Sequence, residues 1–431
     1  MPSTPDPGAL LQRAAAAPKP TLMQSTQCCI VGGGPAGMMA GLLMARAGIE
    51  TVVLEKHGDF LRDFRGDTVH PSTLEILDEI GLKDKFDALP QHRVSRLEAL
   101  FADGPHTVGD FSGLSPFPYL ALVPQWDLLD LLADEARRHH CFSLHMNTEA
   151  TALLRDGAQG PVCGVVAKTP QGELRITADV VIGCDGRRST LRESAGLQPR
   201  NLGAPMDVLW FRLTRQPADP EGTYGVPGRG SFLVLINRNQ YWQAAAVIPK
   251  GTAAQWQAQP ISRFKALVAR RAPFLADQVQ TIASWDDIKL LEVRVDRLDC
   301  WHCPGLLLIG DAAHAMSPIG GVGINLAIQD AVAVANILGP VLKQGNTPGN
   351  DDLAAVQARR MLPTRIIQRV QTLAQRQLIA PALTRQDDGQ PVKIPALLRW
   401  VERSRLLTSI PARVFGLGFR REHVHLPARA P

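Results

Sequence analysis

Acidic residues stand directly after three apolar runs of this chain. Glu55 follows the run TVVL, Asp185 follows VVIGC, and Asp311 follows LLLIG. Each run is short and apolar enough to form a buried strand. A carboxylate at the end of such a strand can accept hydrogen bonds from the hydroxyl groups of a ligand. A chain built only for packing would have no evident use for these acids.

The first acid belongs to a dinucleotide-binding pattern. The glycine motif comprises Gly32, Gly34, Pro35, Ala36 and Gly37. It lies between a predicted strand over residues 28–31 and a predicted helix over residues 38–47. Gly32 permits the tight turn, Gly34 lets a pyrophosphate approach the backbone, and Gly37 lets the helix pack closely on the strands. The helix N-terminus offers free N–H groups to the phosphates, and Glu55 stands where an acid accepts hydrogen bonds from a ribose.

The two later acids lie in segments of similar design. Asp185 is followed by Gly186, by Arg187 and by a Ser-Thr pair that opens a short helix. Asp311 is followed by a glycine-rich loop, and a second helix is predicted to begin near Ile324. Three such segments in this order are far more specific than a glycine motif alone.

Together the three segments resemble the class A, single-component FAD-dependent aromatic monooxygenases, which are related to para-hydroxybenzoate hydroxylase. The motifs cover residues 28 to about 330. The resemblance implies an α/β fold: a Rossmann-like FAD-binding domain, an inserted and mainly β-sheet substrate domain, and a C-terminal helical segment. It implies that NADPH or NADH reduces FAD transiently and that O₂ hydroxylates the substrate through a flavin C4a-hydroperoxide.

The resemblance also assigns cofactor contacts to residues of this chain. The expected FAD-binding residues are Gly32, Gly34, Pro35, Ala36, Gly37, Glu55, Lys56, Arg65, Gln125, Asp185, Asp311, Pro318, Gly321, Gly323, Ile324 and Asn325. Asp311 would bond the ribityl chain, and Pro318 would lie near the flavin. The helix beginning near Ile324 would point its N-terminus at flavin N1 and O2, where a reduced flavin is negatively charged. For His314 we expect a hydrogen bond that braces the loop rather than direct chemistry.

The expected domains alternate along the chain. Residues 1–25 are predicted to be a disordered leader. Residues 26–95, 121–200 and 301–345 are assigned to the FAD-binding domain, residues 96–120 and 201–300 to the substrate-binding sheet, and residues 346–431 to the helical segment. Residues 237–240 form a polar break between two apolar runs, which predicts a hairpin in the substrate sheet.

The substrate sheet has little to hold an anion. The run FLVLI at residues 232–236 has no cation, and the nearby charged groups are Arg212 and Arg238. We therefore expect a largely neutral aromatic or polyketide-like substrate. The substrate-pocket candidates are Trp210, Arg212, Phe232, Val234, Trp242, Pro318 and Gly320. No pair of residues identifies a catalytic base.

Other function classes are not favoured by the sequence. The 431 residues are 45% hydrophobic and 20% charged, and the net charge is 46 − 41 = +5. These values indicate a globular protein without a transmembrane segment or a nucleic-acid partner. A halogenase would carry a W-x-W-x-I-P motif, which is absent. A flavin dehydrogenase or reductase without oxygen transfer and a non-catalytic flavoprotein remain alternatives.

The cysteines indicate a reducing compartment. Seven are present, an odd number, and no secretory signal precedes them, so we expect free thiols and a cytoplasmic protein. Cys300 and Cys303 have the spacing of a redox or zinc pair, but no second such pair exists, and a turn leading into a strand is the preferred interpretation. The oligomeric state is expected to be monomer or homodimer.

Overall fold

The computed structural model describes residues 21–61, 68–384, 392 and 394–425. A mainly parallel sheet forms the first layer of the molecule. Its strand order is β19-β20-β11-β1-β2-β8, and β10 and β9 extend it from β11. The bounds are β1 Thr21–Val31, β2 Thr51–Leu54, β8 Phe142–His145, β9 Glu149–Arg155, β10 Val162–Lys168, β11 Glu173–Gly183, β19 His302–Cys303 and β20 Leu306–Leu308.

Strand β1 begins earlier than the sequence predicts. The apolar run covers residues 28–31, and residues 1–25 were expected to be disordered. That expectation is wrong for residues 21–25, because the backbone of residues 21–26 pairs in parallel with residues 173–178 of β11. Backbone hydrogen bonds extend this strand where its side chains, Leu22 and Met23 among them, are exposed or half-buried and give no buried apolar pattern. Residues 1–20 lie outside the described residues.

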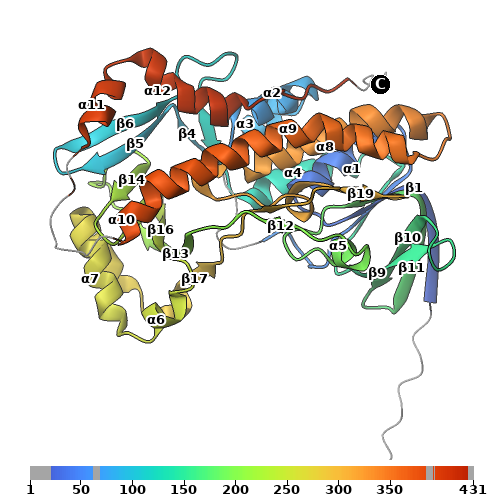
Figure 1. Ribbon diagram of the computed structural model, residues 1–431, viewed down its shortest axis with the longest axis horizontal. Helices are drawn as coiled ribbons and strands as arrows, with labels where there is room; N and C mark the ends of the chain where they lie inside the picture. The colour runs from blue at the N-terminus through green and yellow to red at the C-terminus, as the bar shows by residue number, and fades with distance from the viewer. Residues whose placement is uncertain (1–20, 62–67, 385–391, 393, 426–431) are drawn as a thin grey trace, which may run out of the picture.

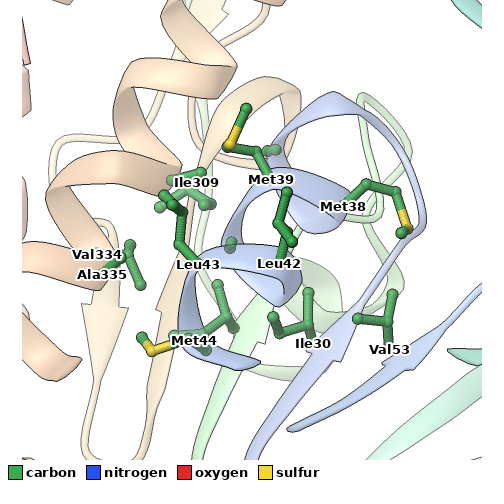
Figure 2. Close-up of a cluster of buried hydrophobic side chains, with 14 of the residues drawn as sticks. Ile30, Met38, Met39, Leu42, Leu43, Met44, Val53, Ile309, Val334 and Ala335 are labelled. Atoms are coloured by element: carbon green, nitrogen blue, oxygen red, sulfur yellow. The ribbon is translucent and has the colours of Figure 1, made fainter. Parts of the chain in front are cut away.

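Helices cover the first sheet and pack on one another. Helix α1 (Pro35–Arg46) lies between the sheet and helix α8 (Gly323–Lys343), and α9 (Asn350–Ala374) runs along α8 (Figure 1). Figure 2 shows Met38, Leu42 and Met44 of α1 among side chains from the strands and α8. Ten of the twelve residues of α1 are buried, so the glycine motif is anchored to a rigid core. Further helices near this sheet are α2 Pro71–Glu79, α3 Lys83–Asp87, α4 Gln125–Ala136 and α5 Thr190–Ser194.

A second sheet of seven strands follows the order β17-β13-β16-β15-β14-β5-β6. Its bounds are β5 Arg96–Phe101, β6 Gly104–Asp110, β13 Met206–Thr214, β14 Tyr224–Pro227, β15 Phe232–Asn237, β16 Tyr241–Pro249 and β17 Lys289–Leu291. The predicted hairpin is confirmed, since β15 and β16 pair across residues 238–240. The strands near residues 95–120 join this sheet, as predicted. The domain boundaries stay a prediction, which this division of the strands supports.

Smaller elements connect the two sheets. Strands β3 (Thr68–Val69), β7 (Leu120–Leu122) and β4 (His92–Val94) form a three-stranded sheet, and β12 (Arg200–Asn201) pairs with β18 (Asp296–Arg297). Helices α6 (Ala253–Gln257) and α7 (Ile261–Arg271) lie below the second sheet in Figure 1. The C-terminal helices α10 (Ala380–Thr384), α11 (Ala396–Glu402) and α12 (Arg405–Ala412) return to it, and α12 packs on β6.

One helix among the described residues is long and apolar enough to cross a membrane. It spans Ile319–Lys343 with a mean hydropathy of 1.5, and 78% of its most apolar window is buried inside the protein. Helices α1 and α9 pack against it. This burial is the pattern of a core helix in a globular protein.

Candidate FAD and substrate site

The glycine motif forms a turn that other residues would disrupt. Gly32 has a φ of +107°, and a Cβ there would lie 2.3 Å from the carbonyl oxygen of Cys184. A Cβ on Gly37 would lie 1.9 Å from the carbonyl oxygen of Gly32. Gly34 differs, because a Cβ on it would meet no atom within 4 Å. The space beside Gly34 is therefore open, as the approach of a pyrophosphate requires.

The N-terminus of α1 faces this open space without a side-chain cap. Pro35 occupies the first helical position, where no N–H is needed. No acceptor within the described part of the chain bonds the N–H groups of Ala36 and Gly37. Unpaired donors and the positive end of the helix dipole together suit a diphosphate. The residues present thus fit the diphosphate of FAD.

Glu55 directly follows β2 and lies beside the glycine motif. Its Oε2 accepts a hydrogen bond from the Gly33 N–H at 2.9 Å, and its Oε1 accepts one from the His57 N–H at 3.1 Å. These bonds orient a half-buried carboxylate next to the turn of the glycine motif, as a ribose-binding acid requires. Lys56 is exposed, and Arg65 lies outside the described residues.

The two aspartates of the later segments have different surroundings. Asp311, in a 3₁₀ turn over Gly310–Ala312, accepts a hydrogen bond from Arg187 Nε at 2.9 Å and remains partly exposed. Asp185 instead accepts hydrogen bonds from Ser189 Oγ at 2.6 Å and from the Leu191 N–H at 3.1 Å. Burial raises the pKa of Asp185. Its bonds therefore fix the start of α5, while Asp311 presents a carboxylate suited to a ligand hydroxyl.

A buried arginine that belongs to none of the sequence motifs joins these two segments. Arg192 donates from Nη1 to the carbonyl oxygen of Ala312 at 2.9 Å and from Nη2 to that of Arg187 at 2.7 Å. It lies on α5, four residues after the Arg187-Arg188 pair. Its guanidinium positions the turn that carries Asp311.

Residues 315–322 form a loop between β20 and α8, which we call the flavin loop. Gly320 and Gly321 have φ values of +77° and +61°. A Cβ on Gly320 would lie 3.0 Å from the Phe415 ring, and one on Gly321 would lie 2.8 Å from Thr68 Oγ1. The loop thus passes between two other segments where only glycines fit, and it leads directly into Gly323, the first residue of α8.

The N-terminus of α8 also has no side-chain cap. No acceptor among the described residues bonds the N–H groups of Ile324 and Asn325. Pro318 precedes the turn of the loop at Ile319–Gly321. The helix end is therefore a second site with unpaired donors, suited to the anionic end of a reduced flavin ring.

His70 and Asn325 join the start of α2 to the flavin loop. Asn325 Oδ1 accepts hydrogen bonds from the His70 N–H at 3.0 Å and from Thr73 Oγ1 at 2.6 Å. Burial lowers the pKa of His70 to about 4, although its ring nitrogen Nε2 lies 2.9 Å from the carbonyl oxygen of Gly320. A neutral imidazole that donates from Nε2 to this carbonyl accounts for the contact. No motif in the sequence marks His70 as a site residue.

The expected bracing role of His314 is confirmed. His314 Nε2 lies 2.6 Å from Asp330 Oδ2, which also accepts a hydrogen bond from the Gly310 N–H at 3.1 Å. Asp330 Oδ1 accepts a bond from Arg360 Nε at 2.9 Å, and Arg360 Nη1 pairs with Glu422 at 3.1 Å. Burial raises the pKa of Asp330, but His314 and Arg360 outweigh it, and the net pKa is lowered. This network connects the Gly310 turn to α8, α9 and the C-terminal segment.

The second sheet turns an apolar face toward the flavin loop. Trp210, Phe232 and Val234 alternate with fully buried neighbours, and all three pack in one cluster with Ile319 of the loop. Arg212 is exposed, and its guanidinium carbon lies 3.8 Å from the centre of the Tyr241 ring. The pocket candidates Trp210, Phe232 and Val234 are thus brought together.

Trp242 requires a correction. It is fully buried on the opposite face of the sheet, packs with Phe211 and Phe274, and donates from Nε1 to Asp219 at 2.8 Å. Successive residues of a strand face opposite sides, and the register places Trp242 with the layer of α7 rather than with the loop. Trp242 therefore belongs to the core and not to the substrate pocket.

Gln125 lies at a helix start, and the cysteine pair lies in a turn and a strand. Gln125 is the first residue of α4 and is half-buried. Cys300 and Cys303 are free thiols, and His302–Cys303 form strand β19, which pairs with β20 as a turn and strand would. No cluster of three or more metal-ligating side chains exists within the described ranges.

Comparison with known proteins gives the family. A family model described as an FAD binding domain matches residues 25–369. The 6-methylpretetramide 4-monooxygenase of Streptomyces rimosus is 34% identical over 362 residues, which cover 82% of this chain and 85% of that protein. The chain belongs to the FAD-binding-domain family of monooxygenases. The FAD cofactor and the class A resemblance are thereby confirmed.

Other relatives agree with this assignment. A 12-dehydrotetracycline 5-monooxygenase/anhydrotetracycline 6-monooxygenase of Streptomyces rimosus is 28% identical over 326 residues, covering 73% of this chain and 62% of that longer protein. The crystal structure of pqsL, a probable FAD-dependent monooxygenase from Pseudomonas aeruginosa, is 21% identical with a TM-score of 0.71, covering 83% of this chain and 98% of that one. This structural likeness confirms the fold.

Proposed function

We propose that this monooxygenase hydroxylates a multi-ring, largely neutral aromatic or polyketide-like molecule, with O₂ as the oxygen donor and NADH or NADPH as the transient reductant. The observation that supports this most is that Trp210, Phe232 and Val234 are partly buried and pack against the same apolar cluster as Ile319 of the flavin loop. Flat aromatic rings bury well against such a face. The relatives named for pretetramide and tetracycline compounds support the same substrate class.

The cations on this face of β13 and β17 are not placed to bind a substrate carboxylate. Arg212 stacks on the Tyr241 ring and is exposed. Lys289, which pairs with Trp210 across the strands, is exposed and donates to the carbonyl oxygen of Asp286 at 2.8 Å. A carboxylate buried without a cation would be costly, so a neutral substrate is favoured.

The chain binds, orients and shields the reactants. The N-terminus of α1 would hold the FAD diphosphate, Glu55 and Asp311 would accept hydrogen bonds from its hydroxyl groups, and the N-terminus of α8 would stabilise negative charge on the reduced ring. The apolar sheet face would exclude water beside the ring and align the substrate. Bound FAD, once reduced, supplies the activation of O₂.

A substrate panel tests the proposal. The purified FAD-loaded protein would be mixed with NADH or NADPH and with neutral three- and four-ring phenols, anthraquinones, simple phenols and benzoates. We expect oxidation of the nicotinamide to be stimulated by the multi-ring compounds, with ¹⁸O from ¹⁸O₂ in the product. Stimulation by benzoates alone would contradict the neutral-substrate assignment. Stimulated oxidation without ¹⁸O in any product would favour a reductase.

We further propose a cytoplasmic protein that is a monomer or a homodimer. The described cysteines are all free thiols, which suits a reducing compartment where NAD(P)H is available. Light scattering coupled to size-exclusion chromatography would give the oligomeric state, and a mass above that of a dimer would contradict this proposal.

A further inference from the structure

The flavin loop has few backbone partners of its own. Within residues 315–319, one hydrogen bond joins it to the backbone of another described segment, from the Asp296 N–H to the carbonyl oxygen of Ala315 at 3.3 Å. Yet this part of the loop is buried through Ser317. Buried backbone groups need partners, which must therefore come from side chains.

Three glutamines of α9 and the turn that follows it supply these partners. Gln368, Gln371 and Gln375, here called the glutamine row, are 0 to 1% exposed. Their spacing of three and four residues places them on one helix face. Such a face packed inside a protein would ordinarily be apolar. Three buried amides here indicate a specific role, because each would destabilise the fold without hydrogen bonds.

Gln371 bonds the loop on both sides of Pro318. Its Oε1 accepts a hydrogen bond from the Ser317 N–H at 3.2 Å. Its Nε2 donates to the carbonyl oxygens of Ser317 at 2.9 Å and Ile319 at 2.8 Å. One amide thus pairs with donor and acceptor groups as the edge of a strand would. A carboxylate or a hydroxyl could not supply this pattern.

The other two amides extend the same contact. Gln368 Nε2 donates to the carbonyl oxygens of Ala315 at 3.1 Å and Asp296 at 2.8 Å, and its Oε1 accepts from Arg297 Nη1 at 2.7 Å. Gln375 Nε2 donates to Ser317 Oγ at 2.7 Å. Gln375 begins a π-helical turn, a feature frequent near functional sites.

We propose that Gln371, supported by Gln368 and Gln375, is a positioning residue that fixes the flavin loop against the FAD ring. This inference rests on the proposed FAD site, in which Pro318 and the following glycines lie beside the flavin. The glutamine row sets the distance of Pro318 from the ring without touching it. It also connects the helical C-terminal segment to the reaction centre.

The test compares Gln371→Leu with Gln357→Leu. Gln357 lies on the same helix and also bonds backbone groups, accepting from the Trp301 N–H at 2.8 Å and donating to the carbonyl oxygen of Asp299 at 2.9 Å. It therefore controls for the loss of a glutamine that bonds a backbone segment from α9. The FAD dissociation constant is measured from quenching of flavin fluorescence, and the bound flavin is compared by its visible absorption and circular dichroism. Melting of the apoprotein reports on folding separately.

We expect Gln371→Leu to raise the FAD dissociation constant about tenfold and to change the visible circular dichroism of the bound flavin. Gln357→Leu should leave both within twofold of the wild type. Gln375→Ala, which removes one bond, should move both readouts in the same direction by less, and it decides the matter if Gln371→Leu does not fold. Wild-type flavin spectra and affinity in the folded variants would overturn the inference. Failure of the wild-type protein itself to bind FAD would instead overturn the proposed site.

Discussion

Substituting Gly34 with alanine tests the diphosphate site without a change in the core. Gly34 has φ −77° and ψ −175°, which alanine adopts without strain, and its Cβ would meet nothing in the protein within 4 Å. The methyl group would instead occupy the space assigned to the FAD diphosphate. We therefore expect Gly34→Ala to fold normally and to bind FAD poorly.

The expected size of the effect follows from the bonds that the methyl group would disturb. A hydrogen bond to a charged group contributes roughly 1.5 to 3 kcal/mol. Loss of one such bond weakens FAD binding by about 2 kcal/mol, or roughly 30-fold. Alanine is a poorer N-cap than glycine by a few tenths of a kcal/mol or more, but it lowers the entropy of the unfolded chain by about as much. The free energy of unfolding of the apoprotein should thus change by less than about 1 kcal/mol.

Gly349→Ala is a matched control. Gly349 is the N-cap of α9 with φ −79° and ψ 174°, and its Cβ would make an ordinary contact with Asp352 at 3.7 Å. It shares the capping loss of Gly34→Ala but is distant in sequence from every predicted FAD contact. Titration of apoprotein with FAD and urea denaturation would be run on both variants. FAD binding by Gly34→Ala within twofold of that of Gly349→Ala would refute the placement of the diphosphate.

Three further predictions concern buried groups. The pKa of His70 is lowered from 6.5 to about 4, so the unfolded chain binds more protons in this range, and up to about 3 kcal/mol of stability is lost as pH falls from 6.5 to 4. The urea midpoint should therefore depend less steeply on pH in His70→Gln than in the wild type, and an unchanged slope would refute this. Asp330→Asn removes the charge paired with the fully buried Arg360, and urea denaturation should show a free energy of unfolding lower by about 3 to 5 kcal/mol. A loss below about 1 kcal/mol would show that the pair does not stabilise the fold. Trp242→Ala empties a core site and should lower the free energy of unfolding by about 3 to 5 kcal/mol, whereas Trp210→Ala should mainly raise KM for the aromatic substrate. Denaturation and steady-state kinetics would contradict this if Trp210→Ala gave the larger loss of stability and Trp242→Ala the larger rise in KM.

The local parts of the site could be predicted from the sequence. A strand, a turn that requires Gly32 and Gly37, and a helix N-terminus are determined by residues within about ten positions of one another, and the structure shows the close approaches that make these glycines necessary. The same holds for the flavin loop, where an apolar run, glycines and a helix follow directly.

Features that depend on distant segments could not be read in this way. Trp210 and Trp242 are similar in type and both lie on apolar strands, but the strand register places them on opposite faces. Asp185 stands where a ligand-binding acid is expected, and its hydrogen bonds from Ser189 and Leu191 at the start of α5 could not be read from that position. The pairing of Asp330 with Arg360 joins two helices whose packing no local pattern specifies.

As a monooxygenase, this chain should transfer one oxygen atom from O₂ to an aromatic substrate. The most direct measurement is mass spectrometry of the product formed from a multi-ring phenol by the FAD-loaded enzyme with NAD(P)H under ¹⁸O₂, beside a reaction in H₂¹⁸O. We expect one ¹⁸O atom in the product under ¹⁸O₂ and none from labelled water. Consumption of NAD(P)H across the whole panel with no ¹⁸O₂-derived oxygen in any product would contradict it.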